Sequence, residues 1–453
     1  MKKVHFIGIG GIGVSALARF YLKNGWEVSG SDLESSETIT ALEKLGVKIF
    51  VGKHKVKNLN PQADLVIYSP AIKSDNPELL KAKSYPSASS GSRAASRGKL
   101  EAISYPQALG QLTKKYFTIA VSGTHGKSTT VAMISLILIK AGLDPTVILG
   151  TKLKEFGNSN FRMGSKLPTT KYKLPFLVIE ADEWGASFLY FWPKIIVLTN
   201  IEKEHLDYYK NLNHILKTYK KYISHLPKTG VLIANRDDQN IKKIIRKEKT
   251  SFYSLSDTEA KKLKNILEVP GVHNISNAQS ALTTARVLKI PDRISFKALS
   301  EYKGAWRRFE IFTKYLAARP YTLISDYAHH PTEIKATLQA AREKFKGRKI
   351  WAVFQPHQYQ RTYYFFKDFV RAFDLADEII LTEIYQVTGR EERKILRKVS
   401  ARKLAVDIRK RRKKVHFVKD FEKIPKFIKT RVKGKDVVLV MGAGDIYKII
   451  DFL

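Results

Sequence analysis

The feature that most constrains the fold is the segment SGTHGKST at residues 122–129, which lies between the apolar run FTIAV and an apolar helical segment. Glycines let backbone N–H groups wrap around phosphate oxygens, and a helix N-terminus adds the positive end of its dipole. Lys127 can reach the β- and γ-phosphates of a nucleotide, and the Ser128 hydroxyl can bind Mg²⁺. Val121 stands where the usual phosphate-loop pattern has glycine. The sequence therefore predicts a variant phosphate loop, with an ordinary glycine turn as the alternative.

Acidic residues and a histidine follow the next two predicted strands. Glu180 ends the apolar strand FLVIE, with Asp182 and Glu183 just beyond it, and His205 comes five residues after the strand at 195–200. A carboxylate at a strand end next to a phosphate loop can hold the Mg²⁺ of the nucleotide. A surface acidic turn and a structural histidine are the alternatives. The phosphate loop favours a metal-binding role for Glu180 and His205.

A second glycine-rich turn lies at the N-terminus. GIGGIG contains Gly8, Gly10 and Gly13 in the spacing G-x-G-x-x-G between a predicted strand and a predicted helix, and Asp32 ends the second strand. This context predicts a diphosphate ligand, with Asp32 at the distance where an acidic residue meets a ribose hydroxyl. The glycines do not distinguish NAD from a nucleotide sugar. A tight turn that only packs helix against strand is the alternative.

Polar side chains also follow several later elements. Asparagine amides near a helix start can bind a base or a ribose, although N-capping is equally common. An arginine can clamp a carboxylate in a bidentate fashion. Ligands of α/β sheets bind at the carboxyl ends of parallel strands. The candidates of these kinds are Asn274, Asn277, Arg307, Arg308, Asp326, His329, His330, His357 and Arg361.

The order of predicted strands and helices indicates an α/β fold with parallel sheets. Three runs of such units predict three domains, at residues 1–106, 107–304 and 305–453. A stretch rich in Ser, Ala, Gly and Arg predicts a flexible insert at residues 84–103.

Composition limits the class of protein. The 453 residues include no cysteine, which excludes disulfides, thiolate metal sites and a cysteine nucleophile. No apolar run is long enough to span a bilayer, and the glycines of the N-terminus come too early for a signal peptide, so we expect a cytoplasmic protein. The net charge of +38 suits anionic ligands. A nucleic-acid-binding protein would also explain this charge, but a lysine-rich solvated surface explains it more simply.

Taken together and in this order, ten segments resemble the Mur ligase family. They are GIGGIG, YSPAIKSDNPEL, GTHGKST, EADE, TNIEKEHLD, HNISNA, WRRFE, DYAHHPTE, FQPHQYQRT and GAGDI, and they run from Gly8 to Ile446. The resemblance implies an N-terminal Rossmann-like domain for a UDP-sugar, a central P-loop-type ATPase domain and a C-terminal α/β Rossmann-like ligase domain. It implies that ATP and Mg²⁺ activate the carboxylate of UDP-N-acetylmuramate as an acyl phosphate, which the amine of L-alanine then attacks, in peptidoglycan precursor synthesis.

The resemblance also implies a role for each matching residue. The expected catalytic residues are Lys127, His205, Asp326, His330 and Arg361, with His330 and Arg361 near the incoming alanine. The expected metal ligands are Ser128, Glu180 and His205. The expected ATP-binding residues are Gly123, Thr124, His125, Gly126, Lys127, Ser128, Thr129, Asn274, Asn277, Arg308 and Asp326. The expected UDP-sugar-binding residues are Gly8, Gly10, Gly11, Gly13, Asp32 and Ser69.

Three alternatives stay open at this point. A sibling ligase of the same family would attach a preformed peptide to UDP-N-acetylmuramate, although the segment FQPHQYQRT argues against it. An NAD-dependent oxidoreductase would use the N-terminal glycine turn but leaves GTHGKST without a role. A basic nucleic-acid-binding protein would explain the charge but not the ordered phosphate and metal residues. We expect no specific nucleic-acid partner and a monomer or a weak homodimer.

Overall fold

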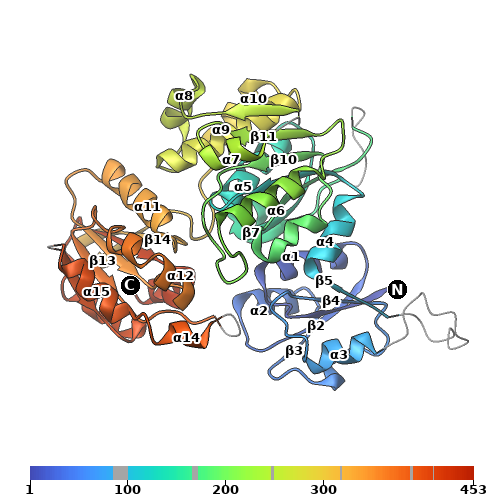
Figure 1. Cartoon of the computed structure of the whole chain (residues 1–453), viewed down its shortest axis with the longest axis horizontal. Helices are drawn as coiled ribbons and strands as arrows, with labels where there is room; N and C mark the ends of the chain where they lie inside the picture. Colours follow the sequence, from blue (N-terminus) through green and yellow to red (C-terminus); the bar gives the residue numbers. More distant parts are fainter. Residues whose placement is uncertain (85–99, 166–171, 246–248, 317–318, 388–390, 412) are drawn as a thin grey trace, which may run out of the picture.

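The computed structural model describes residues 1–84, 100–165, 172–245, 249–316, 319–387, 391–411 and 413–453. Within these residues the chain forms three α/β units, each built on its own sheet of mainly parallel strands. Figure 1 shows the N-terminal unit in blue, the central unit in cyan to yellow and the C-terminal unit in orange to red. The predicted fold class, three α/β domains in series, is confirmed.

The N-terminal sheet has five parallel strands in the order β3-β2-β1-β4-β5. The apolar side chains of β1 and β4 are buried because helices cover both faces of a parallel sheet. The elements are β1 (Lys3–Ile7), α1 (Ile12–Lys23), β2 (Glu27–Asp32), α2 (Glu37–Glu43), β3 (Lys48–Val51), β4 (Leu65–Tyr68), α3 (Pro77–Lys83), β5 (Glu101–Ser104) and α4 (Tyr105–Thr113).

Strand β5 corrects the predicted flexible insert at residues 84–103. Its residues pair in parallel with β4, from Leu65 opposite Glu101 to Tyr68 opposite Ser104. Ile103 is buried in this pairing. Burial of this apolar side chain fixes residues 101–104 as a strand, although composition predicted a flexible segment up to residue 103. The rest of the insert, residues 85–99, lies outside the described residues. Helix α4 follows β5 directly and runs across the expected domain boundary between residues 106 and 107.

The central sheet has seven strands in the order β12-β11-β10-β6-β9-β7-β8. Only β8 is antiparallel among them, pairing with β7 at the edge. Helix α5 is buried on nearly all sides because α9 and α10 cover the face that the sheet leaves open. The elements are β6 (Phe117–Ser122), α5 (Lys127–Lys140), β7 (Thr146–Leu153), β8 (Ser159–Arg162), β9 (Phe176–Glu180), the 3₁₀ segment η3 (Trp184–Tyr190), β10 (Ile195–Leu198), α6 (Leu212–Ile223), β11 (Val231–Asn235), α7 (Gln239–Ile244), β12 (Thr250–Tyr253), α8 (Glu259–Ile266), α9 (Val272–Val287) and α10 (Asp292–Ser300).

The C-terminal sheet has six strands in the order β13-β14-β18-β15-β16-β17. The edge strand β13 is antiparallel to β14, and its side chains alternate between half-buried and exposed, as an edge strand with one covered face requires. The elements are β13 (Glu310–Leu316), β14 (Arg319–Asp326), α11 (Pro331–Lys344), β15 (Ile350–Phe354), α12 (Tyr359–Tyr364), α13 (Phe366–Val370), β16 (Glu378–Leu381), α14 (Arg393–Leu396), α15 (Ala401–Arg409), β17 (Lys414–Phe417), α16 (Ile424–Lys429), β18 (Val437–Met441) and the 3₁₀ segment η5 (Asp445–Phe452).

One hydrophobic core joins the N-terminal and central units. Its buried residues come from α1 and α4 on one side and from β9, η3 and α6 on the other. The Asn160 amide of β8 also donates to the Ile12 carbonyl at 2.5 Å and to Ser15 Oγ at 2.9 Å, at the first turn of α1. The glycine turn before α1 is therefore held firmly against the central sheet.

In the part of the chain that the structure describes, no helix combines the length and the apolarity needed to cross a bilayer.

Candidate active site

The predicted phosphate loop forms the connection between β6 and α5. Gly123 and Gly126 have φ angles of +138° and +83°, which side chains with a Cβ rarely adopt. Asn200, after β10, holds the loop: its side-chain oxygen accepts from the His125 N–H at 2.9 Å, and its carbonyl accepts from the Thr124 N–H at 2.9 Å. The loop thus leads into the N-terminus of α5 with its conformation fixed from the neighbouring strand end.

Lys127, the first residue of α5, lies among oxygen atoms. Its Nζ donates to the Gly123 carbonyl at 2.6 Å and to Glu183 Oε2 at 2.8 Å. Burial alone would lower the pKa of Lys127, but the charges of Glu183 and Asp182 outweigh burial and raise it above its ordinary value. Burial likewise opposes ionisation of Glu183, yet Lys127 and His205 lower the pKa of that carboxyl to about 2. Both groups are therefore charged at neutral pH.

The three expected metal ligands fall into two groups near Lys127. Glu180, at the end of β9, accepts from the Gly150 N–H at 2.5 Å and interacts with the Ser128 hydroxyl. His205 lies instead beside Glu183, with 3.5 Å between Nε2 and Oε1, and forms a group with Asp182 and Glu183 whose candidate ligand atoms lie within 4.8 Å of one another. Asp182 and Glu183 follow Glu180 closely in the sequence, but no role was predicted for either residue.

These residues fit a magnesium ion. Mg²⁺ prefers oxygen ligands, and the carboxylates of Asp182 and Glu183 meet one imidazole here, while Glu180 and the Ser128 hydroxyl form a separate pair that also lies near Lys127. Glu183 Oε1 is buried and lacks a hydrogen-bond partner within the described residues, with His205 Nε2 at an ion-pair distance of 3.5 Å, so a cation could take the place of a protonated imidazole there. The donor set suits a hard divalent cation better than a soft one.

A cavity opens beside the phosphate loop between the central and C-terminal units. Asn274 and Asn277, on the first turns of α9, are buried in its wall, and Arg308 and Asp326 line it from the other side. Asp326, at the end of β14, accepts from the Phe309 and Ala328 N–H groups at 2.8 Å each. The structure thus brings expected ATP-binding residues of two domains to one cavity, namely His125, Gly126, Thr129, Asn274, Asn277, Arg308 and Asp326. Other lining residues that sequence reasoning missed are Glu202, His273, Tyr302 and Glu333.

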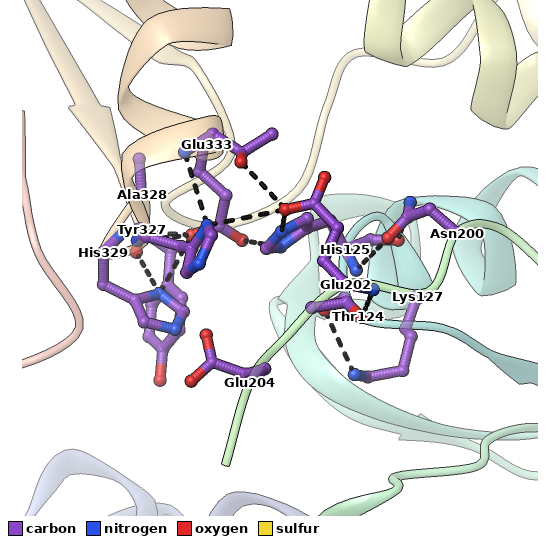
Figure 2. A network of polar contacts seen from close by, with 12 residues as sticks. Thr124, His125, Lys127, Asn200, Glu202, Glu204, Tyr327, Ala328, His329 and Glu333 are labelled. Atoms are coloured by element: carbon purple, nitrogen blue, oxygen red, sulfur yellow. Dashed lines mark hydrogen bonds and ion pairs between the residues drawn. The ribbon is translucent and has the colours of Figure 1, made fainter. Parts of the chain in front are cut away.

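A second polar network connects the central unit to α11 of the C-terminal unit (Figure 2). The loop histidine His125 lies with Nδ1 3.0 Å from Glu333 Oε1 and with Nε2 3.5 Å from Glu202 Oε2. Thr332 donates to Glu202 at 2.9 Å, and the His330 ring lies 5.0 Å from the His125 ring. Burial opposes protonation of His125, but the carboxylates of Glu333 and Glu202 raise its pKa to about 10.

Arg361, the expected carboxylate clamp, already holds a carboxylate of the chain itself. Its Nε and Nη2 both lie 3.0 Å from Glu204 Oε1, and both residues are buried. Burial would raise the pKa of Glu204, but the charge of Arg361 lowers it well below its ordinary value. Glu204 was missed from the sequence, although it precedes the predicted ligand His205.

The expected UDP-sugar residues gather at the carboxyl edge of the N-terminal sheet. Gly8 has a φ angle of +79°, and a Cβ placed on it would lie 3.0 Å from the Cβ of Ser69. Asp32 accepts from the Gly10 N–H at 2.8 Å and from the Leu33 N–H at 2.7 Å. Its carboxylate therefore shapes the glycine turn, a contact that the ribose-binding hypothesis did not include.

Three α/β domains with a phosphate loop, carboxylates at a neighbouring strand end and a cavity closed by a third domain define a multidomain phosphate-loop enzyme. Family models match the whole architecture: "Mur ligase family, catalytic domain" at residues 3–117, "Mur ligase middle domain" at 121–285 and "Mur ligase, glutamate ligase domain" at 307–444. The chain belongs to the Mur ligase family.

Two curated relatives are UDP-N-acetylmuramate–L-alanine ligases. The protein from Acetivibrio thermocellus is 40% identical over 475 residues, covering 99% of this chain and 94% of the relative. The protein from Persephonella marina is 40% identical over 472 residues, covering 100% of this chain and 96% of the relative. The crystal structure of a UDP-N-acetylmuramate–alanine ligase from Thermotoga maritima has a TM-score of 0.78 at 28% identity, covering 100% and 98% of the two chains.

Proposed function

We propose that this chain is an ATP-dependent ligase that forms an amide between the carboxylate of UDP-N-acetylmuramate and the amine of L-alanine, in peptidoglycan precursor synthesis. The observation that carries this function is a phosphate loop that has strand-end carboxylates beside its lysine and, next to it, a cavity lined by the central and C-terminal domains. The curated relatives named for this activity cover nearly the full chain.

The three domains divide the substrates among them. The N-terminal domain, residues 1–106, binds the UDP-sugar at Gly8, Gly10, Gly11, Gly13, Asp32 and Ser69. The central domain, residues 107–304, holds the phosphates of ATP, and the C-terminal domain, residues 305–453, closes the nucleotide cavity and receives the amino acid. The protein acts in the cytoplasm, as a monomer or a weak homodimer.

The first chemical step brings together two anions, ATP and the carboxylate of the UDP-sugar. The γ-phosphoryl group of ATP moves to a carboxylate oxygen of the UDP-sugar, its bond to the bridging oxygen breaks, and ADP leaves. Lys127 leaves Glu183 to contact the transferring group, and the loop N–H groups stabilise its charge. Ser128, Glu180 and His205, the last with Asp182 and Glu183 beside it, would hold Mg²⁺, which would offset the negative charge of the phosphates.

The second step makes the amide. The amine nitrogen attacks the acyl carbon, a tetrahedral intermediate collapses, phosphate leaves, and the nitrogen loses a proton. Arg361 releases the Glu204 carboxylate and binds the carboxylate of the amino acid instead, because the two groups have the same charge and shape. His330 lines this side of the site, and closure of the C-terminal domain keeps water from the acyl phosphate.

An omission assay tests the function. Phosphate release should require ATP, Mg²⁺, UDP-N-acetylmuramate and L-alanine together, and chelation of the metal should stop it. Release at the same rate without the UDP-sugar would contradict the ligase function. A panel of amine acceptors, including L-alanine, glycine, L-serine and a preformed peptide, separates this ligase from its peptide-attaching sibling.

A further inference from the structure

The hydroxyl group of Tyr105 occupies a place between the two nucleotide-binding turns that the reaction described above leaves without a role. Tyr105 is the first residue of α4, and its ring is packed against the core shared by the N-terminal and central units. Its hydroxyl oxygen lies over the first turn of α1, where a Cβ placed on Gly13 would be only 2.7 Å from it. The phenol therefore covers the end of the N-terminal glycine turn.

The first turn of α1, which this phenol covers, lies against the central sheet: Asn160 of β8 donates to the Ile12 carbonyl, and on the neighbouring strand β7 the Gly150 N–H donates to Glu180. Burial, and after it the charges of Glu180 and Asp182, raise the pKa of Tyr105, which places the ring within electrostatic reach of both carboxylates. Glu180 in turn interacts with Ser128 and with Lys127 of the phosphate loop. The hydroxyl thus lies over the turn proposed for the diphosphate, where that turn meets the central unit that carries the phosphate loop.

The backbone of α4, which carries Tyr105, is fixed at its first turn and again further along the helix. Ser104 and Gln107 form a capping box at the start of α4, and Pro106 sets the backbone of its first turn. Further along α4, a Cβ on Gly110 would lie 2.4 Å from the Tyr190 carbonyl of the central unit, so the helix touches the backbone there. A side chain on such a rigid helix start is well suited to position a ligand.

We propose that the Tyr105 hydroxyl donates a hydrogen bond to the carboxylate of the UDP-sugar and holds that group between the glycine turn and the phosphate loop. This inference rests on the proposed function. A carboxylate arriving here faces Glu180 and Asp182, which repel it, and a neutral donor adds attraction without another charge. A phenol is neutral at neutral pH, and a carboxylate has only acceptor atoms to offer it, so the hydroxyl is the donor in this pair.

Binding measurements with two nucleotide sugars test the assignment. UDP-N-acetylmuramate carries the carboxylate, and UDP-N-acetylglucosamine has the same nucleotide and amino sugar without it. We expect Tyr105→Phe to weaken binding of the first about 10- to 100-fold, as loss of a hydrogen bond to a charged group does, and to leave binding of the second unchanged. Calorimetry with Mg²⁺ and without ATP measures both affinities.

Tyr116→Phe is the matched control, because Tyr116 belongs to the same core, is buried beside Phe20, and directly precedes β6, at the end of that strand opposite the phosphate loop. It should bind both sugars as the wild type does. Equal weakening of both sugars by Tyr105→Phe would assign the hydroxyl to the diphosphate and overturn the proposal, and so would unchanged binding of both. If the wild-type protein binds neither sugar, the proposed function itself fails. If the wild type binds and Tyr105→Phe binds equally well, only the role of the Tyr105 hydroxyl fails.

Discussion

At the scale of single residues, the site is built from charged groups that neutralise one another until substrates arrive. Lys127 is paired with Glu183 at 2.8 Å, and Arg361 is paired with Glu204 at 3.0 Å. Removing one partner of a buried pair leaves the other charge without compensation, which is costly. The same pairs keep both cations oriented, and a phosphate or a carboxylate can replace the glutamate as the partner.

Lys127→Ala should lower the rate of phosphate release at least about 100-fold, because the transferring phosphoryl group loses its positive partner. The chain should still fold, since His205 remains next to Glu183. The measurement is the omission assay, with the unfolding temperature followed in parallel.

Lys140→Ala provides the control on the same helix. Lys140 lies at the exposed end of α5 and pairs with Glu301 at 2.6 Å. Exposed pairs of this kind contribute little, about 0–1 kcal/mol, so this variant should keep its activity. Equal losses of activity in the two variants would contradict the role of Lys127.

At the scale of elements, the contact between the phosphate loop and α9 determines the geometry of the nucleotide cavity. Gly126 precedes α5 in the left-handed conformation, and a Cβ on it would lie 2.4 Å from Asn277 Oδ1 of α9. Gly126→Ala should therefore displace Asn277 and raise the KM for ATP about 10-fold or more, in addition to the backbone strain of about 1–2 kcal/mol. Steady-state kinetics with varied ATP checks this.

The variant Gly46→Ala distinguishes the effect of backbone strain from the effect of displacing Asn277. Gly46 has nearly the same φ angle, +86° against +83°, but no atom lies within 4 Å of the place that a Cβ on it would take. This variant should lose a similar amount of folding stability through backbone strain and keep its KM for ATP. An unchanged KM in Gly126→Ala would show that the contact with Asn277 is unimportant for the nucleotide.

At the scale of the whole molecule, the C-terminal unit is held to the central unit by groups that titrate. His125 links Glu202 of the central unit to Glu333 of α11, and its pKa is raised from 6.5 to about 10. A raised pKa in the closed form means that the stabilisation is complete below pH about 6.5 and is lost as the pH rises through about 10. We expect the two units to separate more readily at alkaline pH.

Energy transfer between dyes on the two units can follow this separation. The chain has no cysteine, so single cysteines introduced at the exposed positions Lys242 and Lys346 can be labelled selectively. The efficiency of energy transfer should fall as the pH rises from 7 to about 10 in the ligand-free protein. His125→Gln should start from lower transfer and change little over this range, and the same decrease in the variant would assign the titration to another group.

Much of the fold and of the candidate site could be predicted because it depends on local sequence. Strand–turn–helix order follows from apolar periodicity and glycine position, so the phosphate loop and the N-terminal glycine turn were found, together with the strand-end residues Glu180 and Asp326. The missed residues Glu202 and Glu333 lie inside the segments TNIEKEHLD and DYAHHPTE, so their only signal in the sequence was their position next to predicted residues.

The sequence by itself determined the α/β class, the phosphate loop and the resemblance to Mur ligases, because periodicity, glycine turns and short motifs are local properties of the chain. Only the tertiary structure decided which charges meet. His125 and Glu333 are 208 positions apart, and Arg361 and Glu204 are 157 apart. Such partners are chosen by how strand ends of separate domains pack together, and a buried charge takes whichever opposite charge that packing brings within reach.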